Sequence, residues 1–249
     1  MNALPHPALP AFHSAGGRAR TAQVQAYLEG LHRVYLRYRP LPPVTLFVLS
    51  EKDWRERTRV PYGLPFQRTS RLRLYLFIPL VYPDHLLHRL RQALLPVAEG
   101  GLPGPLAEFL DLTLGHEYAH AVQVAWRLRS GRRWLDEFLA NYLFLFALQR
   151  AYPDRYPLYL AWARLLARLK PQNPRLSAYD RLRTGLVDAL HFQGVFTLKA
   201  DALVQKGEEA LIVLLQAPSP KEAYRSLLKT LPDLTDLRLE GPGPSPPGT

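Results

Sequence analysis

The sequence contains no cysteine among its 249 residues. This absence excludes disulfide bonds and every metal site built on thiolate ligands, so any bound metal ion must rely on histidine and carboxylate side chains. A chain without cysteine is compatible with a reducing compartment. We therefore expect a cytoplasmic protein.

The sequence also lacks a hydrophobic run long enough to cross a membrane. Its longest apolar stretches lie around 74–82 and 138–148, whereas a transmembrane helix needs about 20 apolar residues. The first ten residues hold three prolines and no continuous apolar core of the kind found in signal peptides. Neither a membrane partner nor secretion is expected.

Acidic residues are the scarcer charged class, with 21 Asp and Glu against 32 Lys and Arg, and the net charge is +11. A basic chain can bind nucleic acid, anionic membranes or acidic peptides. The arginines are spread along the whole chain, however, and we find no zinc-finger, RNP or helix-turn-helix motif. We interpret the charge as a solvated arginine-rich surface and do not expect a nucleic-acid partner, although an electrostatic binding role stays open.

Composition and periodicity predict one domain with two short flanking segments. Residues 1–17 are expected to form a flexible leader, residues 18–232 a single domain, and residues 233–249, which end in GPGPSPPGT, a disordered tail. Within the domain, 18–103 should contain the sheet and 104–232 should be helical. The expected fold class is α+β, with a small N-terminal mixed β-sheet followed by a mainly helical part.

Two segments rich in β-branched and aromatic residues, 43–50 and 71–80, predict strands. The segment between them holds Pro61, Gly63 and Pro65 and is expected to be loop or irregular sheet. Apolar residues at helical spacing predict helices over 19–38, 84–98, 106–129, 134–150, 156–169, 179–193, 207–216 and 219–230.

The stretch LGHEYAH, residues 114–120, lies inside the helix predicted over 106–129. Residues four apart share a helical face, so His116 and His120 can present their imidazoles to one metal ion. Glu117 projects about 100° round the helix from His116, where its carboxylate can accept a proton from an attacking water. H-E-x-x-H arises by chance in about 1% of chains of this composition. The uncharged residues between and around the histidines favour the metal site.

A zinc site needs a third protein ligand. The helix predicted over 134–150 offers Asp136 and Glu137, whereas the next histidine after the motif is His191. If the first helix ran on to Gly131, His120 would lie about 16 Å back from its end. The connection would then have to fold back, or the helices to cross at an angle, before a carboxylate could reach the histidines.

The two segments together resemble those of gluzincin metallopeptidases in the peptidase MA clan. HEYAH is followed by WLDEFLANY at 134–142, which is similar to the W-L-N-E-G-F-A-E-Y segment of the thermolysin-like catalytic domain in aminopeptidase N relatives. The resemblance covers roughly 106–230 and implies a zincin-like fold for the domain over 18–232, with residues 44–80 as its abbreviated sheet. It also implies Zn²⁺ as cofactor, with His116, His120 and Glu137 as ligands and Glu117 as the general base.

Two further roles follow from the same resemblance. Asn141 occupies the place of an acidic residue that steadies a ligand histidine in many relatives, and an asparagine oxygen can still accept a hydrogen bond from an imidazole N–H. Tyr179 resembles the tyrosine that stabilises the oxyanion, with His191 as the reserve and an ordinary helix-capping tyrosine as the alternative. Tyr118 and Tyr142 are interpreted as packing residues.

The expected activity is zinc-dependent, endopeptidase-like hydrolysis of a peptide or protein substrate. Aminopeptidase activity is not supported, because the Gly-x-Met-Glu-Asn segment that anchors a substrate α-amine has no counterpart and the only methionine is Met1. An extended substrate would add as a strand to the exposed edge of the sheet. Two alternatives stay open: a catalytically weak zincin-fold binding or regulatory module, and a basic nucleic-acid-binding protein with a chance motif. The sequence leaves the oligomeric state open.

Overall fold

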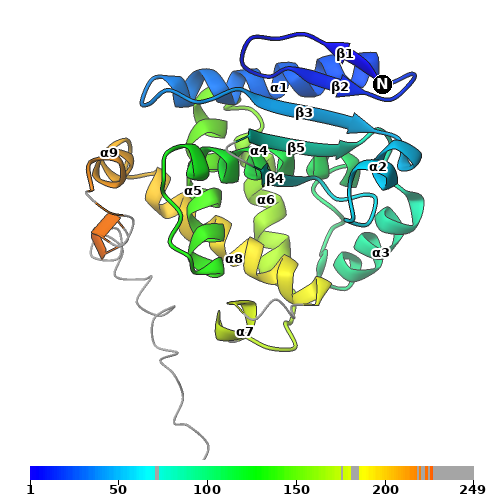
Figure 1. The fold of residues 1–249 in the computed structure, drawn as a ribbon. Coiled ribbons are helices and arrows are strands. Elements are labelled where there is room, and N and C mark those ends of the chain that lie inside the picture. The colour runs from blue at the N-terminus through cyan, green and yellow to red at the C-terminus, as the bar shows by residue number, and fades with distance from the viewer. Residues whose placement is uncertain are drawn as a thin grey trace, which may run out of the picture.

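The computed structural model describes residues 1–70, 73–174, 176–180 and 185–217, together with Ser219, Glu222, Ala223, Arg225 and Ser226. Among these residues the strands lie between Asn2 and Pro79 with two helices interspersed, and only helices follow from Asp84 onward (Figure 1). The predicted α+β class, a small mixed sheet followed by a mainly helical part, is confirmed. The predicted tail over 233–249 and most of the helix predicted over 219–230 lie outside the described residues.

One five-stranded sheet has the order β1-β2-β3-β5-β4. Strands β2, β3 and β5 run parallel to one another. At the two edges of the sheet, β1 pairs antiparallel with β2 and β4 pairs antiparallel with β5. Their bounds are β1 (Asn2–Leu4), β2 (Ala11–His13), β3 (Val44–Leu49), β4 (Phe66–Ser70) and β5 (Arg73–Pro79). Edge strand β4 is the one that lies nearest the helical part (Figure 1).

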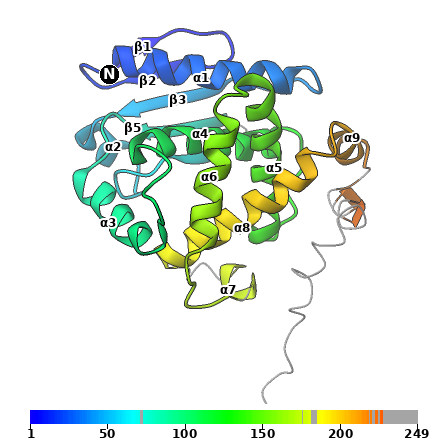
Figure 2. The ribbon, with the colours of Figure 1, turned by 180° about the vertical axis from the view of Figure 1, so that it is seen from behind.

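The helices gather mainly below the sheet in the view of Figure 1, with α1 beside β1 and β2. Figure 2 shows α6 and α8 crossing in front of α4 and α5 when the molecule is seen from behind. Their bounds are α1 (Arg18–Leu36), α2 (Glu51–Arg57), α3 (Asp84–Leu94), the short 3₁₀ helix η1 (Leu95–Val97), α4 (Leu106–Ala125), α5 (Arg133–Ala151), α6 (Tyr156–Ala167), α7 (Leu176–Asp180), α8 (Leu186–Val204) and α9 (Glu209–Gln216). Among the described residues, no helix combines the length and apolarity needed to span a membrane.

Alternating side chains divide the sheet between two cores, as the two-residue period of a strand requires. One face contributes Val44, Leu46 and Val48 of β3 to the main core shared with the helices. The opposite face carries a small aromatic cluster around Phe77, covered by Trp54 of α2. The main core therefore lies between the sheet and the helices, and the candidate motif lies within it.

Residues 1–17, expected as a flexible leader, instead supply strands β1 and β2. Backbone hydrogen bonds tie this segment to β3: Val44 N–H donates to the Ala8 carbonyl at 2.9 Å and Leu46 N–H donates to the Pro10 carbonyl at 2.9 Å. Prolines are tolerated here because a proline carbonyl can still accept. Leu9 is fully buried, so burial of apolar side chains adds to the pairing.

Three other expectations are corrected. The segment between the two predicted strands is loop only over 58–65, which holds Pro61, Gly63 and Pro65, and helix α2 and strand β4 lie on either side of that loop. The helix predicted over 179–193 is two helices: α7 ends at Asp180, and α8 begins at Leu186 behind Gly185. The helix predicted over 106–129 ends at Ala125, which changes the path toward the candidate third ligand.

Gly194 makes a close contact between α8 and α6 possible. A β-carbon at this position would lie 2.5 Å from Ala167 N and 2.7 Å from the Ala163 carbonyl oxygen, both backbone atoms of α6. Gly194→Ala should therefore lower the free energy of unfolding by about 3 kcal/mol, because backbone atoms cannot move aside as a side chain can. Denaturant unfolding measures the change. Gly104→Ala, whose β-carbon would meet only Leu158 at 3.6 Å, is the matched control, and equal stability of the two variants would contradict this packing.

Candidate metal centre

Helix α4 carries the motif and is held close to α5. A β-carbon at Gly115 would collide with the Phe144 ring of α5 and would lie 2.6 Å from the Tyr27 hydroxyl of α1. The missing side chain lets the two helices approach at the residue next to His116. The direction in which His116 points is therefore set by the packing of α4 on α5.

The end of α4 explains how the next helix reaches the histidines. Arg127 has a left-handed backbone, with φ 58°, and Leu128 N–H donates to the Gln123 carbonyl at 2.8 Å. This arrangement, a Schellman motif, stops the helix at Ala125, several residues before the predicted stop at Ser130 and Gly131. The freed residues turn the chain back, so the distance estimated from a longer helix does not arise.

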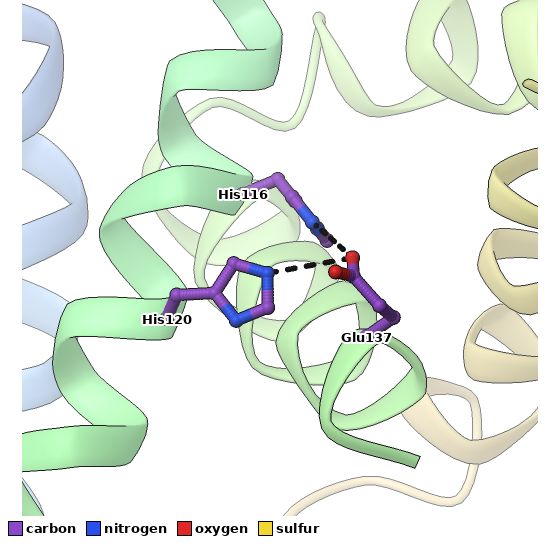
Figure 3. Close-up of side chains that lie close together, drawn as sticks. All are labelled: His116, His120 and Glu137. Carbon is purple, nitrogen blue, oxygen red and sulfur yellow. Dashed lines mark hydrogen bonds and ion pairs between the residues drawn. The ribbon is translucent and has the colours of Figure 1, made fainter. Parts of the chain in front are cut away.

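Glu137 in the second turn of α5 points at both histidines, as Figure 3 shows. Its Oε2 lies 3.1 Å from His116 Nε2 and 3.4 Å from His120 Nε2. Zinc bonds of about 2.0–2.1 Å in a tetrahedral site place ligand atoms about 3.3 Å apart. One ligand atom from each of the three residues lies within 4.8 Å of the others. The structure thus brings together the three residues predicted as ligands, at separations that suit a small divalent ion.

The imidazole of His120 is oriented by Gln123, one turn further along α4. Gln123 Nε2 donates to the Asp136 carbonyl at 2.7 Å, which turns Gln123 Oε1 toward His120 Nδ1 at 2.8 Å. His120 then carries its neutral-form proton on Nδ1 and leaves Nε2 to bind a metal ion. Sequence reasoning missed Gln123, although its spacing of three residues from His120 on a helix was a usable signal.

Electrostatic attraction favours the close approach of Glu137 to His116 and His120. Burial lowers the pKa of His120, but the hydrogen bond and charge of Glu137 outweigh it and raise the pKa to about 9. Burial alone would raise the pKa of Glu137, yet hydrogen bonds from His116 and His120 hold that pKa well below its usual range. Without an ion, protonated His120 and ionised Glu137 therefore attract each other and keep the ligand atoms close.

Glu117 lies beside this group and faces the sheet edge. Its Oε2 accepts a hydrogen bond from the Gln67 N–H of β4 at 2.9 Å. Burial raises the pKa of Glu117, while the two motif histidines and the Gln67 N–H act in the opposite direction. A carboxylate with a raised pKa is a better proton acceptor than one with an ordinary pKa.

A cavity of about 250 Å³ opens onto His116, Glu117 and Glu137. Much of its wall is apolar, with Leu90, Phe109, Leu110, Tyr159, Ala163, Leu166, Leu186, Ala189 and Leu190 among the lining residues. Tyr179 also lines the cavity. Among the described residues that form its wall, His191, the second candidate for the oxyanion donor, does not appear. Tyr118 and Tyr142 are fully buried, in keeping with their interpretation as packing residues.

Gln193 of α8 connects Tyr179 to Glu137, one of the three candidate metal ligands that we call the ligand group (His116, His120 and Glu137). Its Nε2 donates to Glu137 Oε2 at 2.7 Å and to the Tyr179 hydroxyl at 3.2 Å. Because the Tyr179 oxygen accepts from Gln193, its own proton is free to be donated into the cavity. Gln193 was not singled out from the sequence, because it lies 56 positions from Glu137 and no local pattern connects them.

Asn141 has a different role from the one predicted. It was expected to accept a hydrogen bond from a ligand imidazole, but its Oδ1 accepts from the Thr197 hydroxyl at 2.8 Å. Its Nδ2 donates to Gln193 Oε1 at 2.9 Å and to the Glu137 carbonyl at 3.0 Å. Asn141 therefore fixes the orientation of the Gln193 amide and acts on Glu137, not on a histidine.

Comparison with known proteins found no match to any protein-family model, curated protein or solved structure.

Proposed function

We propose that this chain is a zinc-dependent, endopeptidase-like hydrolase of peptide bonds. The observation that carries the proposal is the convergence of His116, His120 and Glu137, with Glu117 on the cavity that His116 and Glu137 also line. The resemblance of HEYAH and WLDEFLANY to gluzincin segments supports the same activity. The cytoplasmic location expected from the sequence stays a prediction.

Each residue has a definite task in this proposal. Bound zinc would acidify a coordinated water and polarise the substrate carbonyl. Glu117 takes the proton of the attacking water and later delivers it to the leaving amine. The Tyr179 hydroxyl donates a hydrogen bond to the developing oxyanion, while its oxygen accepts one from Gln193. The buried walls around Glu117 strengthen these electrostatic interactions, because the local dielectric constant is low.

The position of β4 supports a peptide or protein substrate. Among the residues that the structure describes, this edge strand pairs with β5 alone, and an extended peptide can pair with such an edge. Because the Gln67 N–H already donates to Glu117, a peptide strand lying along β4 would pass directly over the proposed base. The scissile carbonyl would then be presented beside the ligand group.

A catalytically weak binding or regulatory module is the second candidate function. The three ligands alone would serve such a module, since holding an ion requires no base. The half-buried Glu117, oriented by a backbone N–H of β4, is the observation that favours hydrolysis. A peptide-binding module with the same ligands would show zinc and peptide binding without turnover.

Metal analysis combined with a hydrolysis assay tests the proposal. The purified protein should contain one zinc ion per chain and should cleave casein or unstructured peptides at internal bonds. Removal of the ion with a chelator should abolish cleavage, and added zinc should restore it. A zinc-loaded protein that cleaves no peptide would support the binding module instead, and a protein without affinity for zinc would contradict both functions.

The hydroxyl of Tyr179 is expected to act mainly in the transition state. Tyr179→Phe should lower kcat by about 10²–10³-fold with little change in KM, since only one oxyanion donor is lost. The ring would still stack under the Arg133 guanidinium, 4.7 Å from its centroid, so the fold should persist. Tyr156→Phe, which removes a hydroxyl bound to Asp201, is the matched control and should retain kcat. If kcat of Tyr179→Phe stays within about threefold of wild type, the tyrosine has a structural role.

A further inference from the structure

A second hollow, of about 560 Å³, shares Glu137 and Arg133 with the apolar cavity and is lined by His120 in place of His116. Three arginines line it: Arg129, Arg132 and Arg133. We refer to it as the arginine hollow. Because it borders Glu137 and His120, a peptide bound at the candidate ligands with one part in the apolar cavity can place another part here.

The aspartates of the arginine hollow are engaged within the protein. Asp136 Oδ1 accepts hydrogen bonds from Ser130 N–H at 2.6 Å and from the Ser130 hydroxyl at 2.7 Å. Its other oxygen lies 3.5 Å from Arg129 Nε. Asp180 Oδ1 accepts from the Trp134 N–H at 3.2 Å, at the start of α5. These carboxylates therefore stabilise the loop and the helix terminus that form the wall.

Arg132 and Arg133 differ in exposure, although both line the arginine hollow. Arg132 is exposed, and Arg133 is half-buried, with its Nη1 donating to the Tyr179 carbonyl at 3.2 Å. The three guanidinium groups balance the carboxylates of Asp136, Asp180 and Glu137. A divalent ion on the ligand group would therefore leave the arginine hollow with a net positive charge, which favours an anionic group from the substrate.

We propose that the arginine hollow binds a carboxylate of the peptide substrate. The inference rests on the proposed function and specifies its substrate class: peptides with an acidic group a short distance from the scissile bond. Guanidinium groups bind carboxylates through charge-assisted hydrogen bonds, often two at once. Such a carboxylate comes from an aspartate or glutamate side chain or from the peptide C-terminus, and both sources present the same chemistry.

Equilibrium binding tests the inference separately from hydrolysis. Fluorescently labelled octapeptides that differ only in one central residue, Glu or Gln, are titrated with the zinc-loaded Glu117→Gln protein, and anisotropy is measured. Each peptide is made with a free and with an amidated C-terminus. The Glu peptide should bind about tenfold more tightly than the Gln peptide. This preference should shrink as the salt concentration rises. A preference for free over amidated C-termini would identify the terminal carboxylate as the source.

Charge reversal at one exposed position provides the matched comparison. Arg132→Glu should abolish or invert the preference for the carboxylate, while Arg37→Glu, the same change at the exposed end of α1, should preserve it. Equal binding of all four peptides would overturn the inference, as would a preference for the carboxylate that is unchanged in Arg132→Glu. If wild-type protein cleaves none of the peptides but the preference is present, the proposed hydrolysis fails and the carboxylate site stands.

Discussion

Replacing Glu117 by glutamine is expected to lower kcat for peptide hydrolysis by about 10³–10⁴-fold, the upper part of the range for a general base. The zinc content should not change, because Glu117 is not one of the three residues whose ligand atoms converge. Glutamine has nearly the same shape, and its amide oxygen can still accept the hydrogen bond from Gln67 N–H that now orients Glu117. What the amide cannot do is take a proton from water at neutral pH.

Two measurements make this expectation decisive. Glu108→Gln, the same substitution at an exposed position in the first turn of α4, should retain the wild-type kcat. Zinc content determined on the same samples separates loss of the base from loss of the ion. Full activity in Glu117→Gln would show that the base is elsewhere or that the hydrolysis comes from a contaminating protease.

The residues of the motif helix could be predicted from the sequence because their relationship is local. The i, i+4 spacing of His116 and His120 fixes their common face wherever α4 lies in the fold. The approach of Glu137 could not be derived in the same way. It depends on where α4 ends, and the end is set by Arg127, an arginine in a left-handed conformation that usually favours glycine. The resemblance to gluzincins predicted Glu137 as the third ligand, and the early end of α4 explains how its carboxylate comes close to the two histidines.

The same contrast between local and distant signals holds in the sheet. Helix α2 was predictable, since the Ser50 hydroxyl accepts from Asp53 N–H at 3.3 Å in a serine-x-x-acid pattern that marks helix starts. Strand β2 had no such signal, because its three residues are too few to show a period. It forms by pairing with β3, more than thirty residues away in the sequence. The nearby prolines also argue against a strand when the sequence is considered alone.

The hydrogen bonds around Glu137 were equally hidden from the sequence. Gln193 and Thr197 come from α8, and their contacts to Glu137 and Asn141 cross more than fifty positions. The structure shows that Asn141, predicted beside a histidine, belongs to this polar set instead. A buried network of this kind is stable only if each amide is correctly oriented. Here the Thr197 hydroxyl, which donates to Asn141 Oδ1, fixes the first amide of the series.

Removing one imidazole should nearly abolish zinc binding under the proposed function. Zinc sites with four protein ligands bind with about 10–16 kcal/mol, so each ligand contributes about 3–4 kcal/mol and its loss weakens binding by about 10²–10³-fold. His120→Ala removes a ligand and also leaves Gln123 without its partner Nδ1. The purified variant should therefore contain a small fraction of the zinc held by wild type, and peptide hydrolysis should be lost with it.

His88→Ala is the control for His120→Ala, since it removes an exposed imidazole from α3 and should leave zinc at the wild-type level. Circular dichroism should show that His120→Ala keeps its helices, because α4 is held by its apolar contacts and alanine favours a helix. Plasma emission spectroscopy after dialysis gives the stoichiometry. Equal zinc in wild type and His120→Ala would mean that the ion binds elsewhere. The convergence of His120 with His116 and Glu137 would then be a buried ion pair, since protonated His120 and ionised Glu137 attract each other without any ion.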